Sequence, residues 1–152
     1  MTGIFLEMED AIVERLTDRL ATLDPKPKVC RAADLDNIKD RSQGELRVFV
    51  LYNGIAEVSV MHENAPNIGT LTNEYLVWVV ARSAKSHADQ SGTKMLADPV
   101  LEKIIVSLMG ARLIKTARAL HIVPSTIEPA YAEGFGFFPL TFHHRINIRG
   151  EG

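Results

Sequence analysis

The chain has 152 residues, of which 46% are hydrophobic and 24% charged, which suits one soluble domain spanning residues 1–152. A formal net charge of −2 gives no electrostatic basis for binding nucleic acid or an anionic membrane. Cys30 is the only cysteine, so no disulfide can form within the chain.

The N-terminal segment lacks the basic stretch of a signal peptide, and the longest apolar run, YLVWVVA, is too short to cross a bilayer. We therefore expect a soluble, intracellular protein. Residues 6–23 then place hydrophobic side chains at helical spacing, which predicts an amphipathic helix that the DPKP segment ends. Its acidic residues, Glu9 and Asp10 among them, suit an exposed or subunit-facing surface better than a catalytic carboxylate pair.

Residues 31–45 are polar and weakly periodic, which predicts a surface loop able to become ordered on a partner. Asp36 and Lys39 are its candidate contact residues. The next segment, LRVFVLYNGIAEVSV, has two β-rich runs around Asn53-Gly54, a pair favoured in two-residue hairpins. This turn would pair Tyr52 with Ile55 and place Glu57 and Ser59 on a mixed face open to water or to a neighbouring subunit. The other face, with Phe49, Leu51, Ala56 and Val58, would meet the core.

The turn-forming residues of segment 62–74 predict a loop, in which Asn67 is a candidate partner contact. EYLVWVVA then predicts a central strand covered on both faces. The stripe from Val100 to Met109 predicts a second helix that ends at Gly110. This helix begins either at Asp98-Pro99 or near Thr93, with Pro99 inside its first turns.

TARALHIV predicts a fourth strand, and PSTIEPAYAEGFG a loop. From Phe138 to Ile148 the sequence alternates with period two, as in a long strand. The residues predicted to face the core are Phe138, Leu140, Phe142, Ile146 and Ile148. Those predicted to face outward are Thr141, His143, Arg145, Asn147 and Arg149, and we take His143, Arg145 and Arg149 as candidate subunit contacts.

The adjacent His143 and His144 point to opposite faces of such a strand, so they cannot share one metal ion. His144 interrupts the apolar face, and we expect a partly buried side chain with a hydrogen-bond partner. No phosphate loop, nucleophile elbow or metal-protease motif occurs. We therefore predict no catalytic, cofactor-binding or metal-binding residues, although scattered residues could still meet in a triad.

The order of elements and two segments, VFVLYNG and PAYAEGFGFFPLTF, resemble the Mu-like prophage family of small tail proteins over residues 7–148. That family in turn is similar to phage tail terminators. The resemblance implies an α+β fold with a curved, mixed or antiparallel sheet of about five strands and two main helices on one face. It departs after Gly110, where Ala111-Arg112 replaces the family's usual aromatic residue.

By this resemblance the chain is not an enzyme and needs no cofactor. It would form a cyclic oligomer, a hexamer, that caps the tail tube and joins the head, with tube or sheath and neck proteins as partners. It would assemble in the bacterial cytoplasm and remain in the virion tail. The alternatives are a neck or minor tail component, or a small-ligand-binding domain or enzyme.

Overall fold

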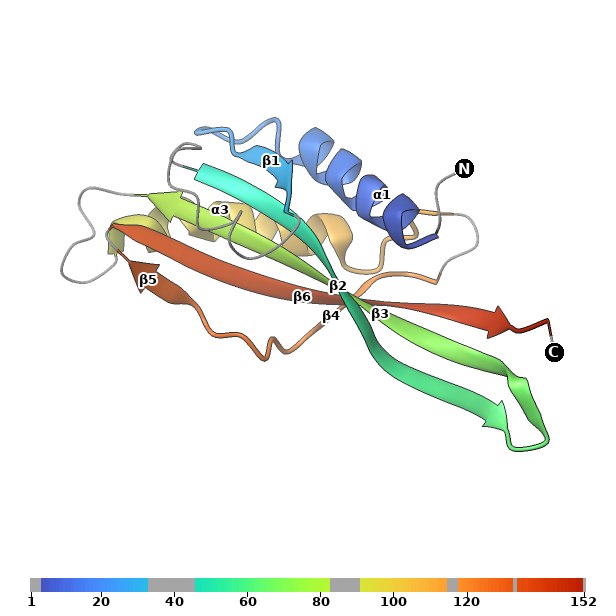
Figure 1. Ribbon diagram of the computed structural model, residues 1–152. Helices are drawn as coiled ribbons and strands as arrows, with labels where there is room; N and C mark the ends of the chain where they lie inside the picture. The colour runs from blue at the N-terminus through green and yellow to red at the C-terminus, as the bar shows by residue number, and fades with distance from the viewer. Residues whose placement is uncertain (1–3, 33–45, 83–90, 115–117, 133, 152) are drawn as a thin grey trace.

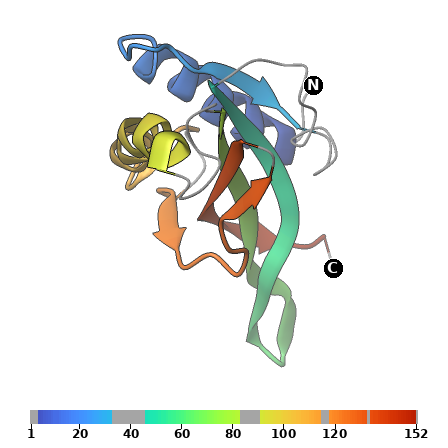
Figure 2. The same cartoon turned by 90° about the vertical axis from the view of Figure 1, so that its left-hand side faces the viewer.

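The computed structural model describes residues 4–32, 46–82, 91–114, 118–132 and 134–151. Within them, two helices lie on one face of a six-stranded mixed sheet of order β1-β2-β3-β6-β4, with β5 also paired to β6 (Figures 1 and 2). This confirms the predicted α+β class. The elements are α1 (Ile4–Arg19), β1 (Lys28–Arg31), β2 (Leu46–His62), β3 (Ala65–Arg82), α3 (Ser91–Leu108), β4 (His121–Val123), β5 (Ala130–Ala132) and β6 (Phe135–Arg149).

The first helix forms as its stripe predicts. Met8, Ile12 and Leu16 are fully buried against the sheet, while the acids between them lie on other faces. The second helix takes the earlier of the two predicted starts, since α3 begins at Ser91 and contains Pro99. Gly110 follows with a φ of +76°, which suits the residue that ends a helix.

The sheet is buried on both faces near its helix-covered end. Its first face packs on α1 and α3 through residues that include Val48, Tyr75 and Phe142. A smaller cluster on the opposite face contains Phe49, Trp78 and Phe137. β3 lies between β2 and β6, so the prediction that EYLVWVVA is central and covered on both sides is confirmed.

The predicted hairpin turn at Asn53-Gly54 is wrong. β2 runs through both residues, and the chain reverses between His62 and Ala65. The pairing register shifts between Tyr52 and Ile55, and Gly54 has a φ of +94°. The glycine therefore provides a left-handed residue for a β-bulge within the strand instead of a turn.

Three further differences between the predicted and the observed elements concern strands. Residues 65–74, predicted as part of a loop, begin β3. β1 and β5 were not predicted as strands; β1 pairs in parallel with β2, and β5 pairs with β6 inside the predicted 124–136 loop. The predicted fourth strand is present but short, as β4.

No helix in the described ranges is long and apolar enough to span a membrane.

Beyond the helices, β2, β3 and the end of β6 continue as a three-stranded projection (Figure 1). We call residues 55–72 and 145–149 the arm. β1 pairs only with Arg47–Val50, and β4 only with residues 141–143, so neither strand extends along the arm. The arm therefore shows two faces and two strand edges.

Candidate assembly surface

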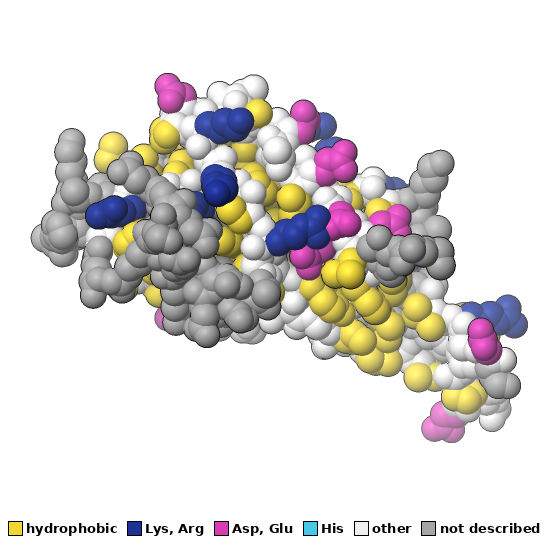
Figure 3. All heavy atoms as spheres, turned by 45° about the horizontal axis from the view of Figure 1, so that its top comes forward, with side chains coloured by type: hydrophobic (Ala, Val, Ile, Leu, Met, Phe, Trp, Pro, Cys, Tyr) yellow, Lys and Arg dark blue, Asp and Glu magenta, His cyan; other side chains and the backbone are white. Residues whose placement is uncertain are grey.

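The helix-side face of the arm is apolar, and beyond the buried Ile146 no described residue covers it. Val58 pairs with Leu71, and Ile146 pairs with Leu71 from the other side, so these side chains share one face. By strand alternation this is the same face that packs on the helices near Tyr75. Val58 is 62% exposed, and Val60 and Ile148 on the same face are also exposed. In the space-filling view, hydrophobic side chains gather where the projection leaves the body, and its tip also carries charged side chains (Figure 3).

The opposite face of the arm is polar and brings together three predicted contact residues. Glu57, Ser59 and Arg145 line one shallow hollow of about 230 Å³. Cross-strand pairing explains this grouping, because Glu57 and Arg145 both pair with Thr72. Arg118, which precedes β4, also lines the hollow and donates to the Asn147 side chain at 3.1 Å.

The end of the arm contains the predicted contacts Arg149 and Asn67. Arg149 pairs with Ile68 and is exposed. Asn67 is held to the end of the chain, because its carbonyl accepts a hydrogen bond from the Gly150 amide at 2.6 Å. Its side chain also donates to the Gly150 carbonyl at 3.4 Å. Asn67 thus lies in a strand of the arm, where a loop was predicted.

A row of polar side chains crosses the sheet where the arm leaves the helices. The Glu74 carboxylate contacts His143 Nε2 at 3.1 Å and accepts from Asn53 Nδ2 at 2.6 Å. The His143 ring also meets the edge of the His121 ring, with centroids 5.8 Å apart. His143 therefore lies on the outward face as predicted, but it is half-buried and bonded within the chain.

His144 faces the helix side and is completely buried. It pairs with Asn73, which is also buried and whose Oδ1 accepts from the Tyr52 hydroxyl at 3.0 Å. Among the described residues, neither ring nitrogen of His144 nor Asn73 Nδ2 has a hydrogen-bond partner. The expectation of a partly buried, hydrogen-bonded His144 is therefore wrong. Burial lowers the pKa of His144, and the nearby His121 lowers it further.

The predicted acidic surface of the first helix is partly engaged within the chain. Arg31 of β1 forms an ion pair with Asp10 and approaches the Glu9 carboxylate at 3.7 Å. Burial raises the pKa of Glu9, although Arg31 acts in the opposite direction. These two acids therefore anchor β1 to α1 and are less available to another subunit than the sequence suggested. Asp36 and Lys39 lie outside the described residues.

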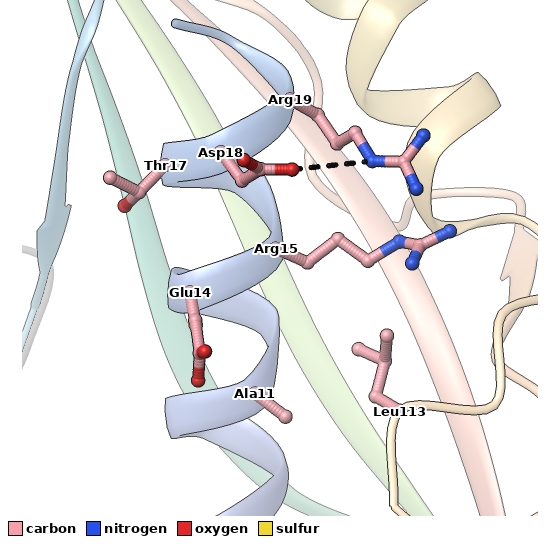
Figure 4. Close-up of a pocket in the computed structure, with 7 residues that line it drawn as sticks. All are labelled: Ala11, Glu14, Arg15, Thr17, Asp18, Arg19 and Leu113. Atoms are coloured by element: carbon pink, nitrogen blue, oxygen red, sulfur yellow. Dashed lines mark ion pairs between the residues drawn. The ribbon is translucent and has the colours of Figure 1, made fainter.

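A hollow with a volume of about 700 Å³ lies along α1 (Figure 4). It is open, and three of its charged residues are engaged locally. Arg19 contacts Asp18 at 3.7 Å, and Arg15 Nε donates to the Ser107 carbonyl at 2.7 Å. Among the described residues, no group of three or more His, Cys, Asp or Glu side chains could hold a metal ion.

The arm was not predicted from the sequence, because Asn53-Gly54 was predicted as a hairpin turn and residues 62–74 as a loop. Val58 was assigned to the core, and Leu71 to the loop between residues 62 and 74. The sequence contains one usable signal: β-favouring residues alternate through EVSVMH and again through IGTLTN, on either side of Glu63-Asn64.

Comparison with known proteins agrees with this fold. The model of one family, the phage tail terminator protein, matches residues 1–151. A chain from the virion of a native gene transfer agent particle has a similar fold, with a TM-score of 0.58 and 13% identity over 97% of this chain and 99% of its own. A second solved structure, whose name states no function, gives a TM-score of 0.53 and 14% identity over 98% of this chain and 100% of its own. No curated protein matches the chain.

A family match over nearly the whole chain defines its class. The chain belongs to the phage tail terminator family and is a structural protein of a phage-type tail. Because identity to both solved structures is low, those likenesses establish the fold alone. The predicted resemblance to tail terminators is thus confirmed at the level of the family.

Proposed function

We propose that this protein caps the tail tube as a closed ring and presents its other surface to the neck of the head. The observation that carries the proposal is the arm, which extends the apolar core face of the sheet beyond the helices that cover it. Val58, at 62% exposure, lies on the same face as the buried Ile146. A monomeric protein gains nothing from a projecting apolar strip, whereas a subunit can bury it against a neighbour.

The polar face of the arm supports the same proposal. Arg145 and Arg149 are exposed and form no ion pair with another described residue. Glu57 and Ser59 lie beside Arg145 around the shallow hollow. Such charges at the rim of an interface set register and partner choice more than affinity. We therefore assign Glu57, Ser59, Arg145 and Arg149 to contacts with a neighbour or with the tube.

The proposed role as a cap on the tail tube favours a ring. A tube built of stacked rings presents rotational symmetry at its end, so a cap that matches it is favoured as a cyclic oligomer with heterologous contacts. We propose a hexamer of this single-domain chain, assembled in the bacterial cytoplasm and retained in the tail of a Mu-like element. Tube or sheath protein and a neck protein are the proposed partners. No catalytic step, cofactor, nucleic acid or membrane enters the mechanism.

The second candidate is a neck or minor tail component with the same fold. Electron microscopy of tails separates the two roles. Deleting the gene should give overlong tails, or tails not joined to heads, with tubes otherwise normal. Supplying Arg145→Glu in place of the wild type should weaken capping if Arg145 contacts a neighbour or the tube. Tails of normal length joined to filled heads in the deletion strain would show that the protein is not the terminator.

A further inference from the structure

The outer face of α3 carries an apolar stripe that nothing in the described part of the chain covers. Met95 and Val106 on α3 and Met109 directly after it are 76%, 69% and 58% exposed, and Pro99 and the exposed Glu102 lie between them on the same side. The helix buries its opposite side, which includes Ala97 and Ile104, in the core. A surface helix normally has polar residues on the side away from the core, so this stripe is an unpartnered apolar face.

The arm offers a second uncovered apolar face on the same chain. Val58 and Val60 on β2 and Ile148 on β6 are 62%, 52% and 40% exposed, and they share the helix-side face. The arm points away from the helices, so it cannot cover the α3 of its own chain (Figure 1).

The two faces match in length. The α3 stripe from Met95 to Met109 spans about 21 Å at 1.5 Å per helical residue. The arm from Ile55 to Val60 spans about 16 Å at 3.3 Å per strand residue. A strand of the arm could therefore lie along most of the stripe.

Charges of opposite sign accompany the two faces, while the exposed Lys94 of α3 lies over the Tyr131 ring of its own chain. Asp98 and Glu102 are exposed on the outer side of α3, and neither forms an ion pair with another described residue. Arg149 follows Ile148 on the edge strand of the arm and is likewise without an ion pair there. An arginine at a strand edge is long enough to extend past that edge toward an acid on a docked helix.

We propose that the apolar face of the arm docks along the outer face of α3 in the next copy of this chain. The contact is heterologous, so in a closed ring every copy gives one arm and receives one. Each apolar face is then covered once, and Arg149 lies near Asp98 or Glu102 of the neighbour. This inference rests on the proposed ring and adds the two surfaces that close it.

The test is cross-linking on assembled tails. In a Cys30→Ala background, the double variant Val60→Cys and Val106→Cys is supplied to the phage and treated with a short bismaleimide. We expect a ladder of covalent oligomers in the denaturing gel, up to the ring size. Either cysteine alone should give no ladder. A matched control that replaces Val106→Cys by Thr17→Cys, an exposed position on α1, should also give none.

A charge in the contact should remove it without unfolding the subunit. Met109→Glu, which puts a charge one turn from Val106 on the same stripe, is added to the cysteine pair and should lower the ladder yield about tenfold or more, as for a loss of at least 1.4 kcal/mol. Circular dichroism of the purified variant verifies that it is folded.

The outcomes separate this inference from the proposed function. The inference is overturned if tails hold the protein but the double variant gives no ladder. It is also overturned if Val60→Cys alone gives dimers, or if the Thr17→Cys control gives the ladder. A cross-link from Val60→Cys to the tube protein would assign the arm to the tube. None of these results contradicts the proposed role in tail capping. That proposal is contradicted only if tails of the deletion strain have normal length and are joined to heads.

Discussion

At the residue scale, the last strand shows how far alternation predicts burial. Phe142 and Ile146 face the helices and are buried, as predicted, whereas Ile148 on the same face is 40% exposed because the helices end before it. Thr141 on the predicted outward face is buried, because this part of the sheet is covered on both sides. Strand period fixes the face of a residue, but only the tertiary arrangement decides what covers that face.

Phe142 and His143 provide a direct test of the two faces. Phe142→Ala should reduce the free energy of unfolding by about 3–5 kcal/mol, as for a large buried aromatic residue. His143→Ala should cost about 1 kcal/mol, since it loses one hydrogen bond to Glu74 and a ring contact. Denaturant titration of both variants measures the difference. Equal, large losses would contradict the assignment of the two faces.

His144 should make the protein less stable in mild acid. Its pKa lies below the ordinary 6.5, so below about pH 6.5 the unfolded chain binds more protons than the folded one. Stability is therefore lost as the pH falls from about 6.5 through the lower pKa of the folded state, and the loss levels off once the folded state itself is protonated. Guanidinium titrations at pH 7 and pH 5 should show a clear drop for the wild type and a smaller one for His144→Leu. An equal drop in both would mean that other groups carry the effect.

At the element scale, Asn53-Gly54 shows why a local turn signal can fail. The pair is favoured at a two-residue turn, but the residues on both sides are strand formers that pair further along the arm. The long hairpin therefore takes the glycine as a bulge and reverses at Glu63-Asn64. Only the strand pairing, which joins segments distant in sequence, decides between the two arrangements.

At Gly69 the neighbouring strand of the arm leaves no room for a side chain. A Cβ atom there would lie 2.5 Å from the Ser59 carbonyl oxygen, which is backbone and cannot move aside alone. Gly69→Ala should therefore separate the arm strands while the core near Val48 and Val77 stays intact. Hydrogen exchange should rise for amides in residues 57–72 and stay low in residues 75–80. A variant with unchanged exchange in the arm would show that the pairing accommodates the methyl group.

At the scale of the whole molecule, helical stripes predicted the two helices and a continuous apolar run predicted the central strand, whereas the α+β class was implied by the family resemblance. β1 and β5 were missed because short strands carry little periodic signal and form only where β2 and β6 offer an edge. The arm was missed for a related reason. Its exposed apolar residues match a core pattern in the sequence, and only the fold reveals that neither α1 nor α3 covers them.

The arm should be separable from the folded core. Both buried clusters lack residues between Ser59 and Thr70, so replacing that segment with Asn-Gly should leave the core packed. Val58 and Leu71 already pair, and the new dipeptide would join them as a two-residue turn. The shortened protein should unfold cooperatively within a few degrees of the wild type, since it loses mainly exposed surface. Supplied in place of the wild type, the shortened protein should give the overlong or unjoined tails of the deletion strain. The protein itself should be folded but should not bind to the tails. Tails of normal length joined to heads would show that the subunits close their ring without the arm, and that the docking surface lies elsewhere on the molecule.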